Sequence, residues 1–141
     1  LDPKHDTLDD LLAYIREYTA EHLELAGIDI RFDLPDTVPH CVLSSAFRRN
    51  MFLTVKEAVN NCAKYSRAAS ASLTIVCTDR TITVAFTDDG AGFDATAVSR
   101  FGNGLLNMRK RVEDLHGSIH IESAPGAGTR IEFLLPITTF V

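Results

Sequence analysis

The sequence predicts an α+β fold: a two-layer α/β sandwich in which three helices cover one face of a mixed, mainly antiparallel sheet. Three observations lead to this prediction. Apolar residues recur at helical spacing in three separate segments. Other segments alternate apolar and polar residues, and most of these follow one another across short turns, as hairpin strands do. The regular strand–helix–strand alternation of a doubly wound parallel sheet is missing.

The N-terminal part of the chain predicts a helix followed by a strand. Thr7 is a suitable N-cap, and Asp10 stands three residues later, at the position that closes a capping box. Apolar residues then recur every three or four positions up to Gly27, a residue type that commonly ends helices. From Ile28 to Leu34 apolar and charged residues alternate, which indicates a strand with one buried face.

The middle of the chain predicts a second helix and a hairpin. An apolar row at helical spacing runs from about Ser44 to Tyr65. Two alternating segments follow, Ala71–Thr78 and Ile82–Phe86, separated by a short turn. This arrangement favours an antiparallel hairpin.

The C-terminal part predicts a loop, a third helix and two strands. A glycine-rich loop after Phe86 breaks any regular element. Apolar residues at helical spacing from Leu105 to Leu115 predict the helix, and Gly117 ends it. The segments Ile119–Ile121 and Ile131–Leu135 alternate again and predict the last two strands.

The composition is that of an ordinary globular domain. The chain has 141 residues, of which 45% are apolar and 23% charged, so we expect residues 1–141 to form a single domain. Lys and Arg number 14 and Asp and Glu 19, which gives a net charge of −5. Proteins that bind the nucleic-acid backbone normally carry a basic surface, so we expect no direct nucleic-acid partner.

The cysteines and the apolar runs limit the class of protein further. Cys41, Cys62 and Cys77 are far apart, which argues against a disulfide framework or a zinc site and is typical of a reducing compartment. No apolar run reaches about 18 residues, so we expect no membrane span. The chain begins with Leu1 rather than Met, and we expect it to be a fragment of a longer protein.

The second predicted helix carries a stripe of polar groups. Glu57, Asn61 and Lys64 are spaced i, i+4 and i+7, which places them on one helix face. An amide oxygen can bind Mg²⁺, which takes few protein ligands and completes its shell with phosphate and water. A carboxylate at this place can orient or deprotonate a nucleophile. A solvated helix face explains the same stripe without any function.

A glycine loop follows the predicted hairpin. Asp88 comes directly after a strand, and Gly90 and Gly92 follow it. A carboxylate at a strand end can accept a hydrogen bond from an amino group such as that of adenine, and glycines let the backbone approach a ligand closely. A simple turn explains this dipeptide pattern equally well.

A second glycine pair opens the third predicted helix. Gly102 and Gly104 flank Asn103, and Leu105 follows. Free N–H groups and the positive dipole end at a helix N-terminus suit phosphate oxygens. The alternative is a loop hinge followed by an ordinary helix start.

Several well-known motifs are missing from the sequence. It holds no P-loop and no protein-kinase H-R-D or D-F-G set. The run from Gly102 reads G-x-G-x-x-N, which departs from the dinucleotide fingerprint. His116 and His120 are separated by Gly117 and a strand start, so they are poor metal ligands.

Taken together in this order, the motifs resemble those of a known family. The chain looks like the catalytic ATP-binding domain of bacterial sensor histidine kinases, within the superfamily that includes DNA gyrase B and MutL. The run from Glu57 to Ser66 is similar to the N box, and the run from Asp88 to Phe93 is similar to the G1 box. Gly102–Leu105, continuing to Gly117, resembles the G2 box, and Ser123–Thr129 resembles the closing turn. The resemblance spans roughly Leu8 to Pro136 and implies a Bergerat-type ATP-binding fold.

The resemblance implies a role for each motif residue. Asn61 would coordinate Mg²⁺, Glu57 would be the candidate base, and Lys64 would lie near the phosphates. Asp88 would bind the adenine amino group in a pocket shaped by Gly90 and Gly92. The remaining ATP-binding positions would be in the lid and at the adenine end: Gly102, Gly104, Leu105 and Thr129. The implied cofactors are ATP and Mg²⁺.

The resemblance also implies signalling partners, and the sequence departs from the family's motif pattern at two places. Tyr65 stands where the N box often carries His, and the lid segment after Asp94 is short. The short form resembles the subfamily whose response regulators carry helix-turn-helix output domains. The resemblance implies that the phosphoacceptor histidine lies on a dimerising helical hairpin. His5 lies outside any predicted long helix and does not fit that role, so the acceptor would lie on a separate dimerisation domain. We therefore expect a monomeric and nearly inactive fragment of an ATP-dependent protein histidine kinase. This domain would be cytoplasmic whether or not the parent protein is anchored in a membrane.

Two alternatives remain open at this point. Anti-sigma-factor serine kinases share the fold and can stand alone in a chain of this size. A degenerate module of the same fold would serve only as a docking surface. Nucleotide binding and the identity of the phosphate acceptor distinguish these hypotheses.

Overall fold

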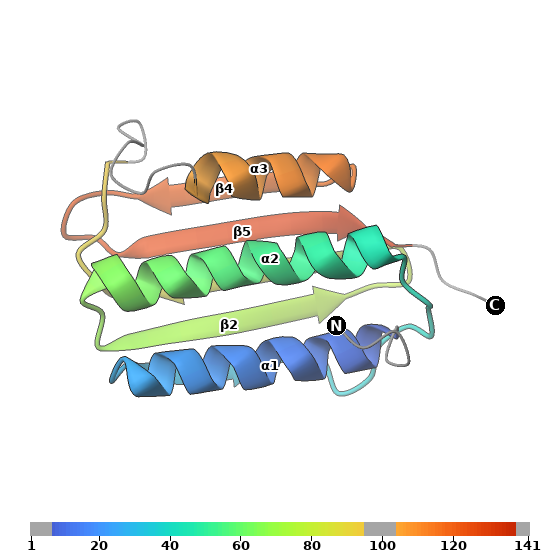
Figure 1. Cartoon of the computed structure of the whole chain (residues 1–141), viewed down its shortest axis with the longest axis horizontal. Helices are drawn as coiled ribbons and strands as arrows, with labels where there is room; N and C mark the ends of the chain where they lie inside the picture. Colours follow the sequence, from blue (N-terminus) through green and yellow to red (C-terminus); the bar gives the residue numbers. More distant parts are fainter. Residues whose placement is uncertain (1–6, 95–103, 138–141) are drawn as a thin grey trace.

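Three helices lie side by side over one face of a five-stranded sheet, as Figure 1 shows. This computed structural model describes residues 7–94 and 104–137. In chain order the elements are α1 (Leu8–Leu25), β1 (Asp29–Asp33), α2 (Ser45–Asn61), the π-helical turn η1 (Cys62–Ser66), β2 (Ser70–Cys77), β3 (Thr81–Asp88), α3 (Gly104–Asp114), β4 (Ser118–Ser123) and β5 (Thr129–Pro136). The predicted two-layer sandwich is confirmed.

The sheet is mixed and mainly antiparallel, as predicted. Its strand order is β1-β2-β3-β5-β4. β1 and β2 run parallel, and the other three pairs are antiparallel. The predicted hairpin is the β2–β3 pair, in which Ala71 lies opposite Asp88. Thr129, at the start of β5, lies opposite Asp88 on the other side. Asp88, the last residue of the central strand β3, therefore has a paired strand on each side.

Local capping and apolar patterning explain the helices. The Thr7 hydroxyl accepts a hydrogen bond from the Asp10 backbone N–H at 3.3 Å, as the capping pattern predicts. The Ser44 hydroxyl accepts one from the N–H of Phe47 at 3.0 Å at the start of α2. α2 is the central helix in Figure 1 and contacts both α1 and α3. Its apolar row packs onto the buried face of the sheet, and in Figure 1 the helix runs over the middle of the sheet, between β2 and β5.

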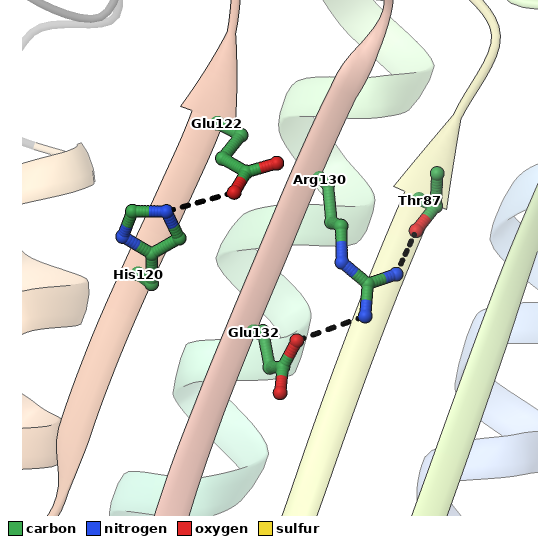
Figure 2. Close-up of polar contacts among 5 residues, drawn as sticks. All are labelled: Thr87, His120, Glu122, Arg130 and Glu132. Atoms are coloured by element: carbon green, nitrogen blue, oxygen red, sulfur yellow. Dashed lines mark hydrogen bonds and ion pairs between the residues drawn. The ribbon is translucent and has the colours of Figure 1, made fainter.

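The second face of the sheet carries polar side chains. Figure 2 shows Arg130 of β5 between Thr87 of β3 and Glu132 of its own strand. The Arg130 guanidinium donates to the Thr87 hydroxyl at 3.2 Å and pairs with the Glu132 carboxylate at 2.8 Å. In β4, Nε2 of His120 and Oε1 of Glu122 are 2.9 Å apart. These exposed pairs add little stability, and they mark the face opposite the helices as the solvated one.

The last turn of the second helix differs from a regular α-helix. The chain forms α-helix up to Asn61 and then the π turn η1, in which the Ser66 hydroxyl donates to the Cys62 carbonyl at 2.6 Å. A π turn holds more residues than an α turn. The spacing that was expected to align Lys64 with Asn61 therefore does not hold beyond Asn61.

Two expectations about the chain as a whole can be compared with the structure. Cys41, Cys62 and Cys77 are all free, as their scattered positions predict. Over the described ranges, no helix has both the length and the apolar character that crossing a membrane requires.

Candidate functional site

A cavity opens between α2 with η1 on one side and α3 with the ends of β3 and β5 on the other. Its walls are mostly apolar and hold a few polar groups, which is the usual make-up of a small-molecule pocket. The lining residues are Ala58, Asn61, Cys62, Tyr65, Ser66, Phe86, Asp88, Gly92, Phe93, Leu105, Thr129 and Ile131. The cavity therefore draws on the second helix, the loop after β3, the third helix and the last strand.

Asp88 supplies the buried carboxylate of this cavity. Its relative exposure is only 7%. Burial raises the pKa of the Asp88 carboxyl, while the backbone N–H of Gly90, which donates to Oδ1 at 2.9 Å, acts in the opposite direction. The Cys62 side chain and the Thr129 backbone also hydrogen-bond to this carboxyl. Because Asp88 lines the cavity, its carboxylate can accept a further hydrogen bond from a ligand or water. An amino group on a flat apolar ring has the right chemistry.

Asp89, next along the chain, turns away from the cavity and fastens the loop. Its Oδ1 accepts from the N–H groups of Ala69 and Ser70 at 2.9 and 3.0 Å, and its Oδ2 accepts from the Ser70 hydroxyl at 2.8 Å. These hydrogen bonds to Ser70 and Ala69 lower the pKa of the Asp89 carboxyl. Asp89 therefore ties the end of β3 to the start of β2.

Gly90 and Gly92 allow the loop after β3 to pack closely against η1 and against the turn before β5. A side chain at Gly90 would run into the backbone carbonyl of Ser66, and the neighbouring Ala91 N–H donates to that carbonyl at 2.5 Å. Gly92 has a φ of +65°, and a side chain there would strike the Ala124 carbonyl. The two glycines thus hold the loop against η1 and against the turn before β5.

The carboxylate of Glu57 lies against the N-terminal turn of α3. A Cβ at Gly104, the first residue of α3, would overlap Oε1 of Glu57. The partly positive end of a helix favours a carboxylate at this place. Glu57 and Gly104, forty-seven residues apart in the sequence, are thereby in contact.

The two adjacent asparagines of α2 point in different directions. The side-chain oxygen of Asn60 accepts a hydrogen bond from the Tyr18 hydroxyl of α1 at 3.0 Å. Asn61 is half-buried and lines the cavity. Of the two asparagines, Asn61 is therefore the one whose side chain can reach a molecule in the cavity, and its role as a metal ligand stays a prediction.

The π turn changes which residue follows Asn61 along the cavity. Tyr65 lines the cavity, whereas Lys64 is exposed and is not among the lining residues of the described chain. The three-residue stripe expected from helical spacing is therefore reduced to Glu57 and Asn61. The physical reason is the wider π turn, which a regular 3.6-residue period does not include.

The structure brings together most of the residues that the sequence nominates. Asn61, Asp88, Gly92, Leu105 and Thr129 all line the cavity. Gly90 donates to Asp88, and Glu57 contacts Gly104 at its edge. Gly102 lies outside the described residues.

Sequence reasoning missed most of the apolar walls. Cys62, Phe86, Phe93 and Ile131 line the cavity, yet their spacing is that of ordinary core residues. Among the missed lining residues, Tyr65 alone could have been predicted, because it stands four residues after Asn61 and helical spacing puts the two on one face.

The comparisons with known proteins agree with this geometry. A family model described as "Histidine kinase-, DNA gyrase B-, and HSP90-like ATPase" matches residues 48–139, well over half of the chain. The chain belongs to this family. The matched range includes every described residue of the cavity.

Individual relatives of this ATPase domain are sensor kinases. The chain is 32% identical to the signal transduction histidine-protein kinase/phosphatase DegS of Brevibacillus brevis over 98% of this chain and 36% of that protein. It is 29% identical to the sensor histidine kinase LiaS of Bacillus subtilis over 87% of this chain and 33% of that protein. The chain thus spans about a third of the length of these relatives.

Solved structures show the same fold. Full-length ShkA, in complex with AMPPNP, superimposes with a TM-score of 0.74 at 19% identity over 93% of this chain and 30% of ShkA. The family match and the sensor-kinase relatives make the chain a catalytic ATP-binding domain of the histidine-kinase type.

The Asp89 contacts predict a specific loss of stability in acid. Because folding lowers the pKa of this carboxyl, its contribution is present above the unfolded pKa of about 3.9 and is lost as the pH falls through the folded pKa. We expect Asp89→Asn to reduce the free energy of unfolding more at pH 6 than at pH 3 in urea titrations. Asp36→Asn, in the exposed loop before α2, is the matched control. Equal losses at the two pH values would contradict this assignment.

Proposed function

We propose that this chain binds ATP–Mg²⁺ and donates the γ-phosphate to a histidine on a separate dimerisation domain, as part of two-component signal transduction. The observation that best supports the proposal is the single cavity that holds both the buried carboxylate of Asp88 and the amide of Asn61. ShkA, which shares the fold, is in complex with AMPPNP.

The Asp88 end of the cavity suits adenine. Its walls include Phe86 and Ile131, which can pack against the faces of a purine ring. The Asp88 carboxylate would accept a hydrogen bond from the exocyclic amino group. Thr129, opposite Asp88 in the sheet, would support the same end of the base.

The Asn61 end of the cavity suits the phosphates. No group of three or more acidic, His or Cys side chains that could hold a metal occurs among the described residues. The donor set is therefore one amide oxygen with a carboxylate one turn earlier, which fits Mg²⁺ shared with a substrate and not an all-protein metal cage. Asn61 would hold the ion, which when bound would offset negative charge on the phosphate oxygens.

The groups beside the phosphates have proposed roles as well. Gly104 and Leu105 would present the N–H groups of the first turn of α3 to phosphate oxygens. Gly102 would belong to the same lid, and Lys64 would supply a positive charge from the solvent side. Glu57, held against α3, would orient or deprotonate the attacking nucleophile.

The phosphate acceptor and the regulator would lie on other parts of the signalling system. The acceptor histidine would lie on a dimerisation domain of the same protein. In support, this chain spans only about a third of the length of the sensor-kinase relatives. The downstream partner would be a response regulator with a helix-turn-helix output domain. The catalytic domain would work in the cytoplasm, and alone it would be monomeric and nearly inactive.

Calorimetric titration of the chain with ATP and MgCl₂ tests nucleotide binding. We expect a dissociation constant in the micromolar to sub-millimolar range. Asp88→Ala removes a hydrogen bond to a charged acceptor and should weaken binding by about a hundredfold. Asn61→Ala should remove the dependence on Mg²⁺.

The outcomes separate the three hypotheses. Wild-type protein that gives no heat and no thermal shift at millimolar ATP is a docking module and not a kinase. If ATP binds, phosphotransfer to an added dimerising histidine hairpin supports the proposal. Transfer to a serine of an anti-sigma antagonist instead would identify the chain as a serine kinase.

The contact between Gly104 and Glu57 yields a further prediction. In Gly104→Ala the new methyl group displaces the Glu57 carboxylate, the flexible end of its side chain. Alanine also favours the helix by up to about 1 kcal/mol, so stability should stay equal or rise. We expect phosphotransfer to the added hairpin to fall about tenfold or more while the melting temperature is kept. Glu113→Ala, exposed on the same helix, is the control. An unchanged transfer rate in Gly104→Ala would show that the position of Glu57 is not needed.

A further inference from the structure

The hydroxyl group of Ser123 lies where three segments of the site meet. Ser123 is the last residue of β4 and pairs with Thr129, the first residue of β5. Its Oγ accepts a hydrogen bond from the backbone N–H of Phe93 at 2.9 Å and donates to the carbonyl of Gly128 at 2.9 Å. The hydroxyl of Thr129 is also 2.9 Å away. One side chain thus joins the loop after β3, the turn before β5 and the start of β5.

If the Ser123 hydroxyl makes all three contacts at once, proton counting gives one direction for the bond between Ser123 and Thr129. A serine hydroxyl has one proton and two lone pairs. The proton of Ser123 goes to the Gly128 carbonyl, which can only accept, and one lone pair takes the Phe93 N–H. The remaining lone pair can only accept, so Thr129 is the donor in the third contact. The hydroxyl proton of Thr129 is therefore committed to Ser123.

This direction determines what Thr129 offers to the cavity. With its proton engaged, the Thr129 hydroxyl has only lone pairs left for a ligand. Asp88, which lies opposite Thr129 in the sheet and lines the same cavity, also offers acceptors. This end of the cavity therefore complements N–H donors and opposes a carbonyl oxygen in the same place.

We propose that Ser123 is a positioning residue that orients the hydroxyl of Thr129, so that the cavity selects a 6-amino purine over a 6-oxo purine. The inference rests on the proposed function, since it requires that the purine of ATP occupies this end of the cavity. Ser123 acts through Thr129 and through the Phe93 backbone, and its own hydroxyl has no capacity left for a ligand.

Equilibrium titrations with ATP and with ITP, each with MgCl₂, test the proposal. ITP carries an oxygen where ATP carries the amino group. For the wild-type chain we expect the dissociation constant of ITP to exceed that of ATP at least about tenfold. In Ser123→Ala the Thr129 proton is free to turn towards the cavity and donate to the 6-oxo group, so the ITP/ATP ratio should fall about fivefold.

Two further variants separate orientation of Thr129 from general support of the fold. Ser123→Thr keeps the hydroxyl and should keep the wild-type ratio. Ser118→Ala, at the exposed start of the same strand, should leave the ratio unchanged. A loss of general support weakens both nucleotides by the same factor and leaves the ratio as it was, and that result in Ser123→Ala would overturn the proposal.

The remaining outcomes are also decisive. If Ser123→Ala fails to fold, Thr129→Val removes the hydroxyl at nearly constant shape and should lower the ratio to a similar extent. An unchanged ratio in Thr129→Val overturns the proposal. Equal affinities of the wild type for ATP and ITP overturn it as well while nucleotide binding stands. If the wild type binds neither nucleotide, the proposed function itself fails.

Discussion

The site depends on keeping one carboxylate, that of Asp88, inside an apolar cavity. Burial opposes its ionisation, and hydrogen bonds from the backbone of Gly90 and Thr129 and from the Cys62 side chain act in the opposite direction, so these donors must be held in place. The surrounding structure is arranged to hold them. Glycines permit the close contacts, and the N–H of Ala91 binds the end of η1 while that of Gly126 binds the carbonyl of Ala91 at 2.6 Å. The part of the cavity around Asp88 is thus built from backbone contacts between segments distant in sequence.

The sheet fixes the position of Asp88, from which these contacts extend. Asp88 is the last residue of the central strand, with Ala71 on one side and Thr129 on the other. α2 covers the middle of the sheet and contacts α3. Glu57 of α2 lies against Gly104 of α3, and Asn61 lines the same cavity as Leu105 of α3. The two ends of the cavity therefore differ in origin: strand ends and turns form one, and helix ends form the other. Under the proposed function, this division would let the base and the phosphates be recognised by separate sets of residues.

The sequence predicts the elements well because their signals are local. Alternation identified β2 and β3, their short turn identified the hairpin, and Thr7 marked the start of α1. The parallel pairing of β1 with β2 and the π turn were not predicted, because both depend on contacts across the fold. At the end of the π turn, the Ser66 carbonyl accepts a hydrogen bond from the N–H of Ala91, which is twenty-five residues away in the sequence. The apolar walls, such as Phe86 and Ile131, have the pattern of core residues, so the sequence could not separate cavity from core.

The most direct test of the account is to map adenosine binding by amide chemical shifts in a ¹⁵N-labelled sample of the chain. Adenosine carries the base without phosphates, so it reports on the Asp88 end alone. The account predicts that the largest shifts fall on Gly90, Gly92 and Thr129, with tripolyphosphate instead shifting Asn61 and Leu105. Shifts centred on the polar face of the sheet, around Glu132, or the same residues shifted by both ligands would contradict it.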